Sequence, residues 1–330
     1  MSGSYAERVS AEIRNFDAAL ASGGVTHSIA PIFTYWACKY LSPRLINIYG
    51  TADIPVLFGN EMLRYAEKSK KEMLRVLSLG SGDCEFETSI HKNVAGRVKL
   101  NWECTDLNPA VSASAKDRAD SMGYGEQFNF HIIDLNEDFV HGQFDIIMIN
   151  HSLHHFIGLE HIFSNIKDNL VPHGRILISD MIGRNGHMRW PEALGIVDSL
   201  WRFLPEKYHF NNHSRCLEKN FINYDCTTGG DFEGVRAQDI LPLLLKDFYF
   251  ERFVGFGNVM DIFTDRTYGH NFNVDSEFDT SFIDYVERLN TELIDRGIVK
   301  PTIMIGTLSI TPVECTFDRW SPQFSMRRPD

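Results

Sequence analysis

Two glycines separated by one residue, Gly80 and Gly82, end an apolar run at 76–79 and precede a polar segment. Glycine has no Cβ, so the backbone can turn sharply at these positions and can lie close to a ligand. In an open α/β sheet, a turn of this kind between a strand and a helix is where nucleotide-like ligands bind. The turn therefore predicts a site for such a ligand.

Polar residues follow the next three apolar runs of the chain. They are Asp106 after 98–104, Asp134 after 128–133, and Asn150 with His151 after 145–149. Asp106 lies at the sequence distance expected of a carboxylate that accepts hydrogen bonds from ribose hydroxyls. Because the carboxyl ends of parallel strands share one edge of a sheet, we expect these residues to surround the ligand.

Histidines are the candidate bases, because imidazole exchanges a proton near neutral pH. His154 and His155 come soon after the fourth run, at the edge where the ligand is expected. Adjacent residues on a helix face different directions, so we expect at most one of the two to face a second substrate. The 13 histidines include no HExxH spacing, so no metal site is predicted.

A dinucleotide-binding turn is the first alternative. It would carry a third glycine at position 85, where this chain has Glu85. Together with Asp83 and Glu87, this acid would repel a pyrophosphate. An NAD(P)-dependent oxidoreductase therefore remains the weaker interpretation, beside a non-catalytic binding protein that keeps the same fold.

Five segments, in this order along the chain, resemble the class I S-adenosylmethionine-dependent methyltransferases: 77–83, 103–108, 133–135, 145–156 and 170–178. More loosely, 182–205 and 235–245 are similar to methyltransferases of bacterial polysaccharide and natural-product pathways. The resemblance implies an α/β, Rossmann-like fold: a mostly parallel seven-stranded sheet with helices on both faces and an antiparallel last strand. It also implies S-adenosyl-L-methionine as the cofactor.

The resemblance assigns the cofactor site to Leu79, Gly80, Ser81, Gly82, Asp83, Asp106, Leu107, Asn108, Asp134, Leu135, Asn150 and His151. The glycine turn would contact the methionine part, Asp106 the ribose, and Asp134 the adenine amine. Two positions depart from the family pattern, because Ser78 replaces an acid and Cys84 replaces a third glycine. Recognition of the amino group would then fall to a backbone carbonyl or to a neighbouring acid.

Methyl transfer requires the acceptor and the methyl group to be held in line, and a base if the acceptor carries a proton. We expect a small-molecule acceptor, with oxygen first and carbon or nitrogen as alternatives, and His154 or His155 as the base. Four residues of the segment after the fifth strand are the candidate acceptor contacts: Arg184, Trp190, Tyr208 and His209.

The composition of this 330-residue chain argues against some classes of binding partner. Its net charge is −12, which argues against a nucleic-acid partner. No apolar run is long enough to span a bilayer, and the six cysteines show no CxxC pair, so we expect a reduced, cytoplasmic protein without a membrane partner. A homodimer remains open.

Alternating apolar runs and helical patterns are the elements that must position these residues. Strands are expected at 76–79, 98–104, 128–133, 145–149, 175–179, 249–254 and 302–310, with a turn at 172–174 before the fifth. Helices are expected at 6–20, 58–71, 109–122, 159–170, 190–204, 237–245 and 278–296. The predicted organisation is an N-terminal helical cap (1–73), a cofactor-binding core (74–182), an inserted lid (183–234), the rest of the core (235–312) and an unstructured tail (313–330).

Overall fold

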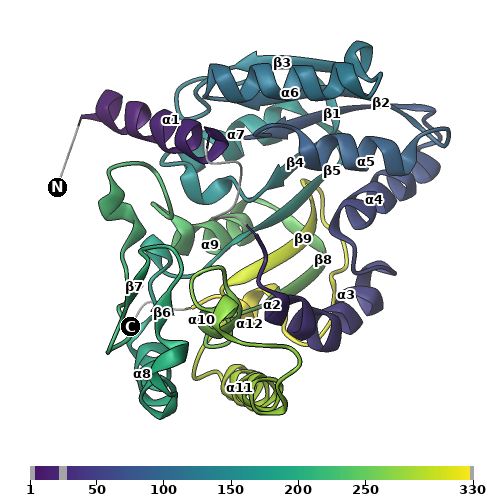
Figure 1. Cartoon of the computed structure of the whole chain (residues 1–330). Helices are drawn as coiled ribbons and strands as arrows, with labels where there is room; N and C mark the ends of the chain where they lie inside the picture. The colour runs from purple at the N-terminus through teal and green to yellow at the C-terminus, as the bar shows by residue number, and fades with distance from the viewer. Residues whose placement is uncertain (1–3, 22–27, 328–330) are drawn as a thin grey trace.

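An eight-stranded sheet forms the centre of the computed structural model, which describes residues 4–21 and 28–327 (Figure 1). Its strands are β1 (Met73–Leu79), β2 (Lys99–Asp106), β3 (Phe128–Ile132), β4 (Phe144–Asn150), β5 (Leu170–Met181), β8 (Tyr249–Phe256), β9 (Ile303–Ser309) and β10 (Thr316–Phe317). Their order is β10-β8-β9-β5-β4-β1-β2-β3. Only β9 runs antiparallel to its neighbours, β5 and β8, which confirms the mostly parallel sheet with an antiparallel last strand.

Two differences from the expected sheet have local causes. The tail contributes the short strand β10, which pairs in parallel with β8 and makes eight strands instead of seven. The turn predicted around Pro172 is instead the first part of β5, where the pairing with β4 shifts register between Phe144 and Ile146. Such an irregularity accommodates a proline, which cannot donate a ladder hydrogen bond.

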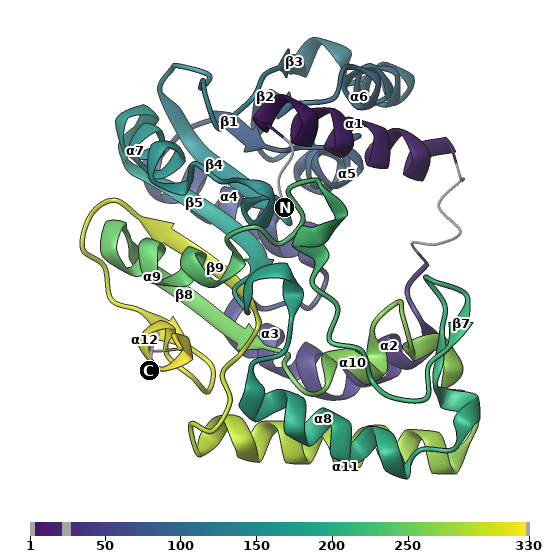
Figure 2. The same cartoon turned by 90° about the vertical axis from the view of Figure 1, so that its left-hand side faces the viewer.

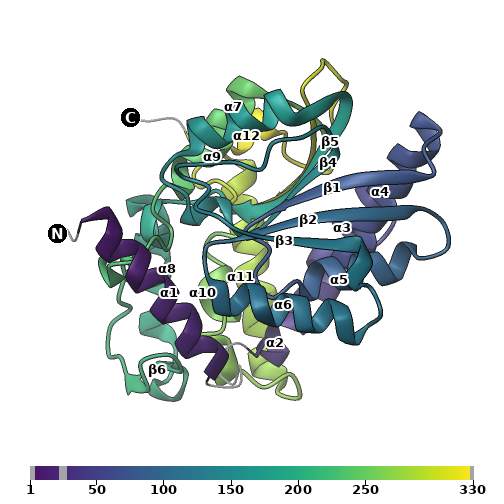
Figure 3. The same ribbon diagram turned by 90° about the horizontal axis from the view of Figure 1, so that it is seen from above.

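Helices cover both faces of the sheet (Figure 3). On one side lie α4 (Ile54–Ser69), α5 (Glu85–Val94) and α6 (Pro109–Ser121), and on the other α7 (Leu159–Asn169), α9 (Ala237–Asp247) and α12 (Pro322–Ser325). Successive strand side chains point to opposite faces. Ile146 and Met148 of β4 therefore join one buried cluster, while Ile147 and Ile149 join the other. Burial on both faces explains why the central strands read as unbroken apolar runs.

The other helical elements are α1 (Tyr5–Ala21), α2 (Pro31–Trp36), the π-helix η2 (Ala37–Leu41), α3 (Ser42–Tyr49), α8 (Pro191–Phe203), α10 (Asp261–Thr264) and α11 (Glu277–Asp295). Short 3₁₀ turns are η3 (Gly125–Gln127), η4 (Leu153–His155), η5 (Asn185–His187), η6 (Glu206–Tyr208), η7 (Cys226–Gly229) and η8 (Gly269–Asn271). β6 (Phe210–Asn211) and β7 (Cys216–Leu217) form a small separate sheet. No helix in the described ranges is long and apolar enough to cross a membrane.

The N-terminal helices lie in two places instead of forming one cap. α1 lies beside α6, where Asn108 Nδ2 donates a hydrogen bond of 2.8 Å to Asp17 Oδ1. α2 packs at the opposite side of the molecule, where Trp36 Nε1 donates to Glu287 Oε2 of α11 at 2.8 Å (Figure 2). One buried cluster includes residues of the predicted cap, core and insertion, so the packing shows no division between these regions. The predicted domain boundaries therefore stay a prediction.

The turn between β1 and α5 has the backbone geometry that the glycines predict. Gly80 and Gly82 have φ values of 68° and 55°, in the left-handed region that side chains with a Cβ rarely adopt. A Cβ on Gly80 would lie 2.7 Å from the Cβ of Ser152, in the loop after β4. The turn therefore approaches β4 more closely than any other residue type would allow.

A buried carboxyl group lies beneath this turn. Glu87 of α5 is 2% exposed, and its Oε1 accepts a hydrogen bond of 2.6 Å from Ser78 Oγ. Its Oε2 has no hydrogen-bond partner among the described residues. Burial raises the pKa of Glu87 to about 7, so the group holds its proton well above the ordinary range. α5 thus supplies a carboxyl group beside Ser78, where the family pattern carries an acid on the strand.

Replacing Gly80 with alanine tests the close approach. We expect Gly80→Ala to lower the free energy of unfolding by about 1–3 kcal/mol, through backbone strain and the clash with Ser152. Gly96→Ala is the matched control, because Gly96 has a φ of 78° but open space around it. Urea unfolding should show a smaller loss for the control, and equal losses would contradict the proposed contact.

Replacing Glu87 with glutamine tests the raised pKa. A carboxyl whose pKa is about 7 in the folded state and 4.5 in the unfolded chain costs no stability below pH 4.5, and the cost grows between pH 4.5 and pH 7. At pH 8 the cost is at most about 3 kcal/mol. Glu87→Gln lacks this charge, so its stability relative to the native protein should increase from pH 5 to pH 8 in urea unfolding. A difference independent of pH would contradict the assignment.

Candidate active site

A cavity of about 740 Å³ opens at the carboxyl edge of the sheet, where β1, β2 and β4 end. It is lined by most of the residues that the sequence assigns to the cofactor: Gly80, Ser81, Gly82, Asp83, Asp106, Leu107, Asn108, Asp134, Leu135, Asn150 and His151. Leu79 is the exception, because its side chain is buried in the core between the sheet and α7. The strand ends thus bring these separate segments together, as the parallel topology requires.

Asp106 lies half-buried at the centre of this edge. Its Oδ2 accepts a hydrogen bond of 3.1 Å from the Gly82 backbone N–H, and its Oδ1 accepts one of 2.7 Å from the Asn108 N–H. Burial raises the pKa of Asp106 above its ordinary value. Each carboxylate oxygen keeps a second lone pair, so the group can still accept hydrogen bonds from hydroxyl groups of a ligand.

Asp134 is held by a residue that the sequence does not associate with it. Its Oδ2 accepts a hydrogen bond of 2.5 Å from Tyr5 Oη of α1, and its Oδ1 accepts from the backbone N–H of Asn136 at 3.0 Å. Burial and the contact with Asp134 raise the pKa of Tyr5, so the phenol stays protonated and donates. α1 is therefore fastened over this end of the cavity.

Several cavity residues have no signal in the sequence. Glu12, Ile13 and Phe16 line the cavity from α1, and Phe232 and Arg266 line it from segments far along the chain. None lies next to a motif, and helix 6–20 shows only an ordinary mixture of apolar and charged residues. Their position depends on packing between distant parts of the chain, which no local pattern reports.

His151 faces the cavity in a strained backbone conformation. Its φ is 52°, and its backbone N–H donates to the Ser179 carbonyl at 2.7 Å. Its Nε2 lies 3.5 Å from Ser179 Oγ. Burial lowers the pKa of His151, so the ring is neutral at neutral pH and can accept a proton. Left-handed backbone at a residue other than glycine is frequent at functional sites.

His155 also lines the cavity, but carboxylates surround it. Glu12 Oε1 lies 2.8 Å from Nδ1, outside hydrogen-bond geometry, and Glu233 Oε2 lies 3.4 Å from Nε2. Burial opposes the charged ring, yet these two acids raise the pKa of His155 to about 9. At neutral pH the ring of His155 is therefore protonated, unless another cation replaces the proton.

His154 lies behind the cavity wall and does not line it. Its Nδ1 is 2.6 Å from Oδ1 of Asp180, whose side chain is fully buried, and its Nε2 lies 3.6 Å from Glu233 Oε1. Burial opposes ionisation of Asp180, but the neighbouring His154 lowers its pKa below the ordinary value. The expectation that at most one of the adjacent histidines reaches the cavity agrees with this arrangement.

The four expected acceptor contacts lie away from the cavity. Tyr208 is 1% exposed and donates its hydroxyl hydrogen bond to Asp279, and His209 stacks on Trp201 with ring centroids 4.4 Å apart. Trp190 precedes α8 and packs with Arg184, whose guanidinium lies 5.3 Å from the ring centroid. Each is an element of packing in the insertion, so the geometry gives no support to an acceptor role.

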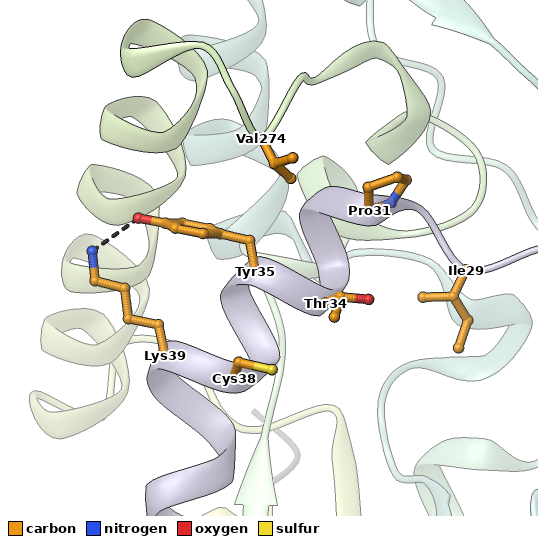
Figure 4. Close-up of a pocket in the computed structure, with 7 residues that line it drawn as sticks. All are labelled: Ile29, Pro31, Thr34, Tyr35, Cys38, Lys39 and Val274. Atoms are coloured by element: carbon orange, nitrogen blue, oxygen red, sulfur yellow. Dashed lines mark hydrogen bonds between the residues drawn. The ribbon is translucent and has the colours of Figure 1, made fainter.

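A second cavity of about 740 Å³ lies beside α2 and is separate from this edge of the sheet (Figure 4). Its lining is Ile29, Pro31, Thr34, Tyr35, Cys38, Lys39 and Val274. Lys39 Nζ donates hydrogen bonds to Tyr35 Oη at 2.9 Å and to Asp284 at 2.7 Å, so its charge is already paired. Apart from Ile29, this cavity contains none of the residues that surround the glycine turn.

Comparison with known proteins identifies the domain that carries the first cavity. Residues 70–219 match the model of a family described as a methyltransferase domain. A highly reducing polyketide synthase of Cordyceps militaris is 27% identical over 136 residues, which are 39% of this chain and 5% of that protein. The chain therefore corresponds to a small part of that relative.

Solved structures give weaker similarities. A geranyl diphosphate methyltransferase in complex with GPP and sinefungin is 10% identical, covering 77% of this chain and 78% of that chain with a TM-score of 0.43. The [4+2]-cyclase SpnF is 12% identical, covering 80% and 83% with a TM-score of 0.44. A methyltransferase from Aquifex aeolicus is 18% identical, covering 46% and 73% with a TM-score of 0.32. Scores this low carry no argument about function.

The matched range contains the glycine turn, Asp106, Asp134 and the end of β4, all of which meet at the cavity. The antiparallel strand β9 lies between β5 and β8, as the resemblance to the class I enzymes implies. On these grounds residues 70–219 form a methyltransferase domain, within a sheet that has the Rossmann-like topology expected of the class I enzymes.

Proposed function

We propose that the protein methylates an ionisable small molecule, at oxygen as the first expectation, with His151 as the base. The observation that carries this proposal is one cavity whose lining includes the acids of the glycine turn, aromatic side chains and a histidine that burial keeps neutral. Its volume of about 740 Å³ falls within the range of small-molecule sites. Cytoplasmic location and the lack of a nucleic-acid partner remain predictions from composition, and the oligomeric state is not predicted.

The end of the cavity nearest the turn fits the cofactor. When bound, S-adenosylmethionine supplies an electrophilic methyl group on a positively charged sulfur. Asp83, Glu85, Asp106 and Asp134 line this end, and carboxylates favour a cation in a partly buried site. The same acids would repel a pyrophosphate at the start of α5, so a nicotinamide coenzyme does not fit. Because Gly80 has no Cβ, the turn can lie close to the loop after β4, which contains Ser152.

Apolar side chains of the same lining fit a largely apolar acceptor. They are Phe16, Phe156 and Phe232, together with Ile29 and Pro55. Aromatic side chains exclude water and bury apolar surface, so they can hold a ring or chain in one orientation. Arg266 also belongs to this lining.

His151 is better placed as a base than the two histidines expected from sequence. Both ring nitrogens of His155 lie within 3.4 Å of carboxylates, and His154 does not reach the cavity. In the proposed step, the acceptor proton moves to the neutral ring of His151. The acceptor atom then bonds to the methyl carbon as the carbon–sulfur bond breaks, and the sulfur leaves as an uncharged thioether.

Carbon is the second candidate acceptor atom. The Cordyceps relative is a polyketide synthase by name, and polyketide chains contain acidic C–H groups next to carbonyls. A neutral histidine can deprotonate such a carbon as well as a hydroxyl group. The identity of the methylated atom therefore rests on analysis of the product.

Asp106→Asn tests the cofactor end. Loss of the charge-assisted hydrogen bonds should weaken binding of S-adenosylmethionine and of its demethylated product about 10- to 100-fold in calorimetry. Asp117→Asn is the matched control, because it removes the same charge from an exposed position on α6. Thermal melting would verify that both variants fold. Unchanged affinity in a folded Asp106→Asn variant, or tight NAD binding by the native protein, would overturn this assignment.

His151→Asn tests the base, and asparagine tolerates the left-handed backbone at this position. Acceptors would be found by screening phenols and β-dicarbonyl compounds for methylated products, whose NMR spectra identify the methylated atom. We expect kcat to fall about 100-fold or more with little change in cofactor affinity, whereas His141→Asn, at an exposed position, should leave kcat unaltered. The acidic limb of the native kcat profile should lie at a lower pH than the ordinary pKa of imidazole, because burial lowers the pKa of His151. Equal kcat values for the native enzyme and His151→Asn would exclude this base.

A further inference from the structure

Three side chains converge beside the cavity in an arrangement that metal ions favour. One ligand atom from each of His154, His155 and Glu233 lies within 4.8 Å of the other two. The two histidines come from the 3₁₀ turn η4 at the end of β4, and Glu233 comes from the end of the insertion, almost eighty residues later. The cluster therefore joins two segments that meet only in the folded protein.

The spacing of the ligand atoms agrees with a shared ion. Nε2 of His154 lies 3.6 Å from Glu233 Oε1, and Nε2 of His155 lies 3.4 Å from Glu233 Oε2. Around a tetrahedral zinc ion with bonds of about 2.0–2.1 Å, neighbouring ligand atoms are separated by about 3.4 Å. These two distances go to different oxygens of Glu233, and the three ligand atoms lie within 4.8 Å of one another, so the side chains would draw together by up to about 1.4 Å around the ion.

The outer contacts of the two histidines match those of metal-bound imidazoles. A histidine that ligates a metal through one ring nitrogen commonly donates the other N–H to a carboxylate. Nδ1 of His154 forms such a hydrogen bond, at 2.6 Å from the buried carboxylate of Asp180. Nδ1 of His155 has a carboxylate at the right distance, Glu12 Oε1 at 2.8 Å, but outside hydrogen-bond geometry. Both Nε2 atoms are thereby directed toward Glu233.

Glu233 also has a hydrogen-bond partner outside the cluster. Its Oε1 is 2.6 Å from Nε2 of His187, whose backbone adopts a φ of 55°. A carboxylate that ligates a metal is usually hydrogen-bonded as well. His187 can therefore hold Glu233 in position without being a ligand itself.

We propose that His154, His155 and Glu233 bind one divalent transition-metal cation such as Zn²⁺. Two imidazoles and a carboxylate suit zinc and its neighbours better than magnesium or calcium, which prefer oxygen ligands throughout. Three protein ligands leave a fourth position open for water or a ligand. This site was not expected from sequence, because adjacent histidines and a distant glutamate match no known ligand spacing.

The ion would fasten the wall of the cavity. His155 and Phe232, the neighbour of Glu233, both line the cavity. The segment that carries Glu233 is also bound to α1, because Glu12 Oε2 accepts the Phe232 backbone N–H at 3.0 Å and Arg8 Nε donates to the Asp231 carbonyl at 3.0 Å. One cation would thus connect the end of β4 to the insertion and, through Glu12, to α1.

In the competing arrangement, hydrogen bonds and ion pairs between the imidazoles and carboxylates hold the cluster together without a metal. Only the proposed site would bind a metal ion, so metal binding distinguishes the two. We would prepare the full chain without a polyhistidine tag, remove metals with a chelator, and titrate it with ZnCl₂ by calorimetry in the presence of a competing chelator. Absorption bands of the Co²⁺-substituted protein would report the coordination number, and anomalous diffraction at the zinc edge would locate the ion.

We expect one Zn²⁺ per chain, with at least a tenfold loss of affinity in Glu233→Gln and in His155→Ala. His161→Ala and Glu126→Gln are the matched controls, because they remove the same types of side chain from exposed positions, and they should bind as the native protein does. Thermal melting with and without Zn²⁺ should show a stabilisation that both site variants lose. Absence of binding, or equal affinity in the site variants, would mean an adventitious ion only and would overturn the proposal without affecting cofactor binding.

Discussion

The contact between the glycine turn and its two neighbouring strands is the constraint on which the rest of the site depends. Ser152 Oγ, after β4, donates to the Leu79 carbonyl at 2.7 Å, and the missing Cβ of Gly80 leaves room for it. On the other side, the backbone N–H of Ser81 donates to the Thr105 carbonyl of β2 at 2.8 Å. Three strand ends are thus held at a fixed spacing, so their polar residues share one cavity.

Pairing between acids and histidines then holds together the segments that form the wall of that cavity. Glu12, Asp180 and Glu233 lie close to His154 and His155, and buried charges are stable only when paired or bound to a metal. Because the partners come from α1, β5, the loop after β4 and the insertion, each pairing also joins separate segments. The electrostatics of the site and the attachment of its wall are therefore the same set of contacts.

Helix α1 shows how a segment without any motif becomes part of the site. Tyr5 donates to Asp134, Asn108 donates to Asp17, and Phe16 contributes to the cavity lining. The helix covers the ends of β2 and β3, so residues assigned to the cofactor also hold the cover in place. Asn108 combines both tasks, since its Oδ1 accepts the Ala110 N–H at 2.8 Å and begins α6.

Local sequence determined the strands, most of the helices, the turn at Gly80 and the acids at the ends of β2 and β3. These features depend on neighbours in the chain: strands buried on both faces need continuous apolar runs, and a left-handed turn needs glycine. The parallel topology then places every carboxyl strand end at one edge, so the order of elements also locates the cofactor site.

Tertiary packing alone decided which residues form the rest of the cavity. Tyr208 and His209 have the composition of a binding site, but they pack into the core of the insertion. His154, His155 and Glu233 have no informative spacing, but they converge on one another. The physical reason is that a contact between distant segments depends on how two surfaces fit together, and neither segment by itself records the shape or charge of the other.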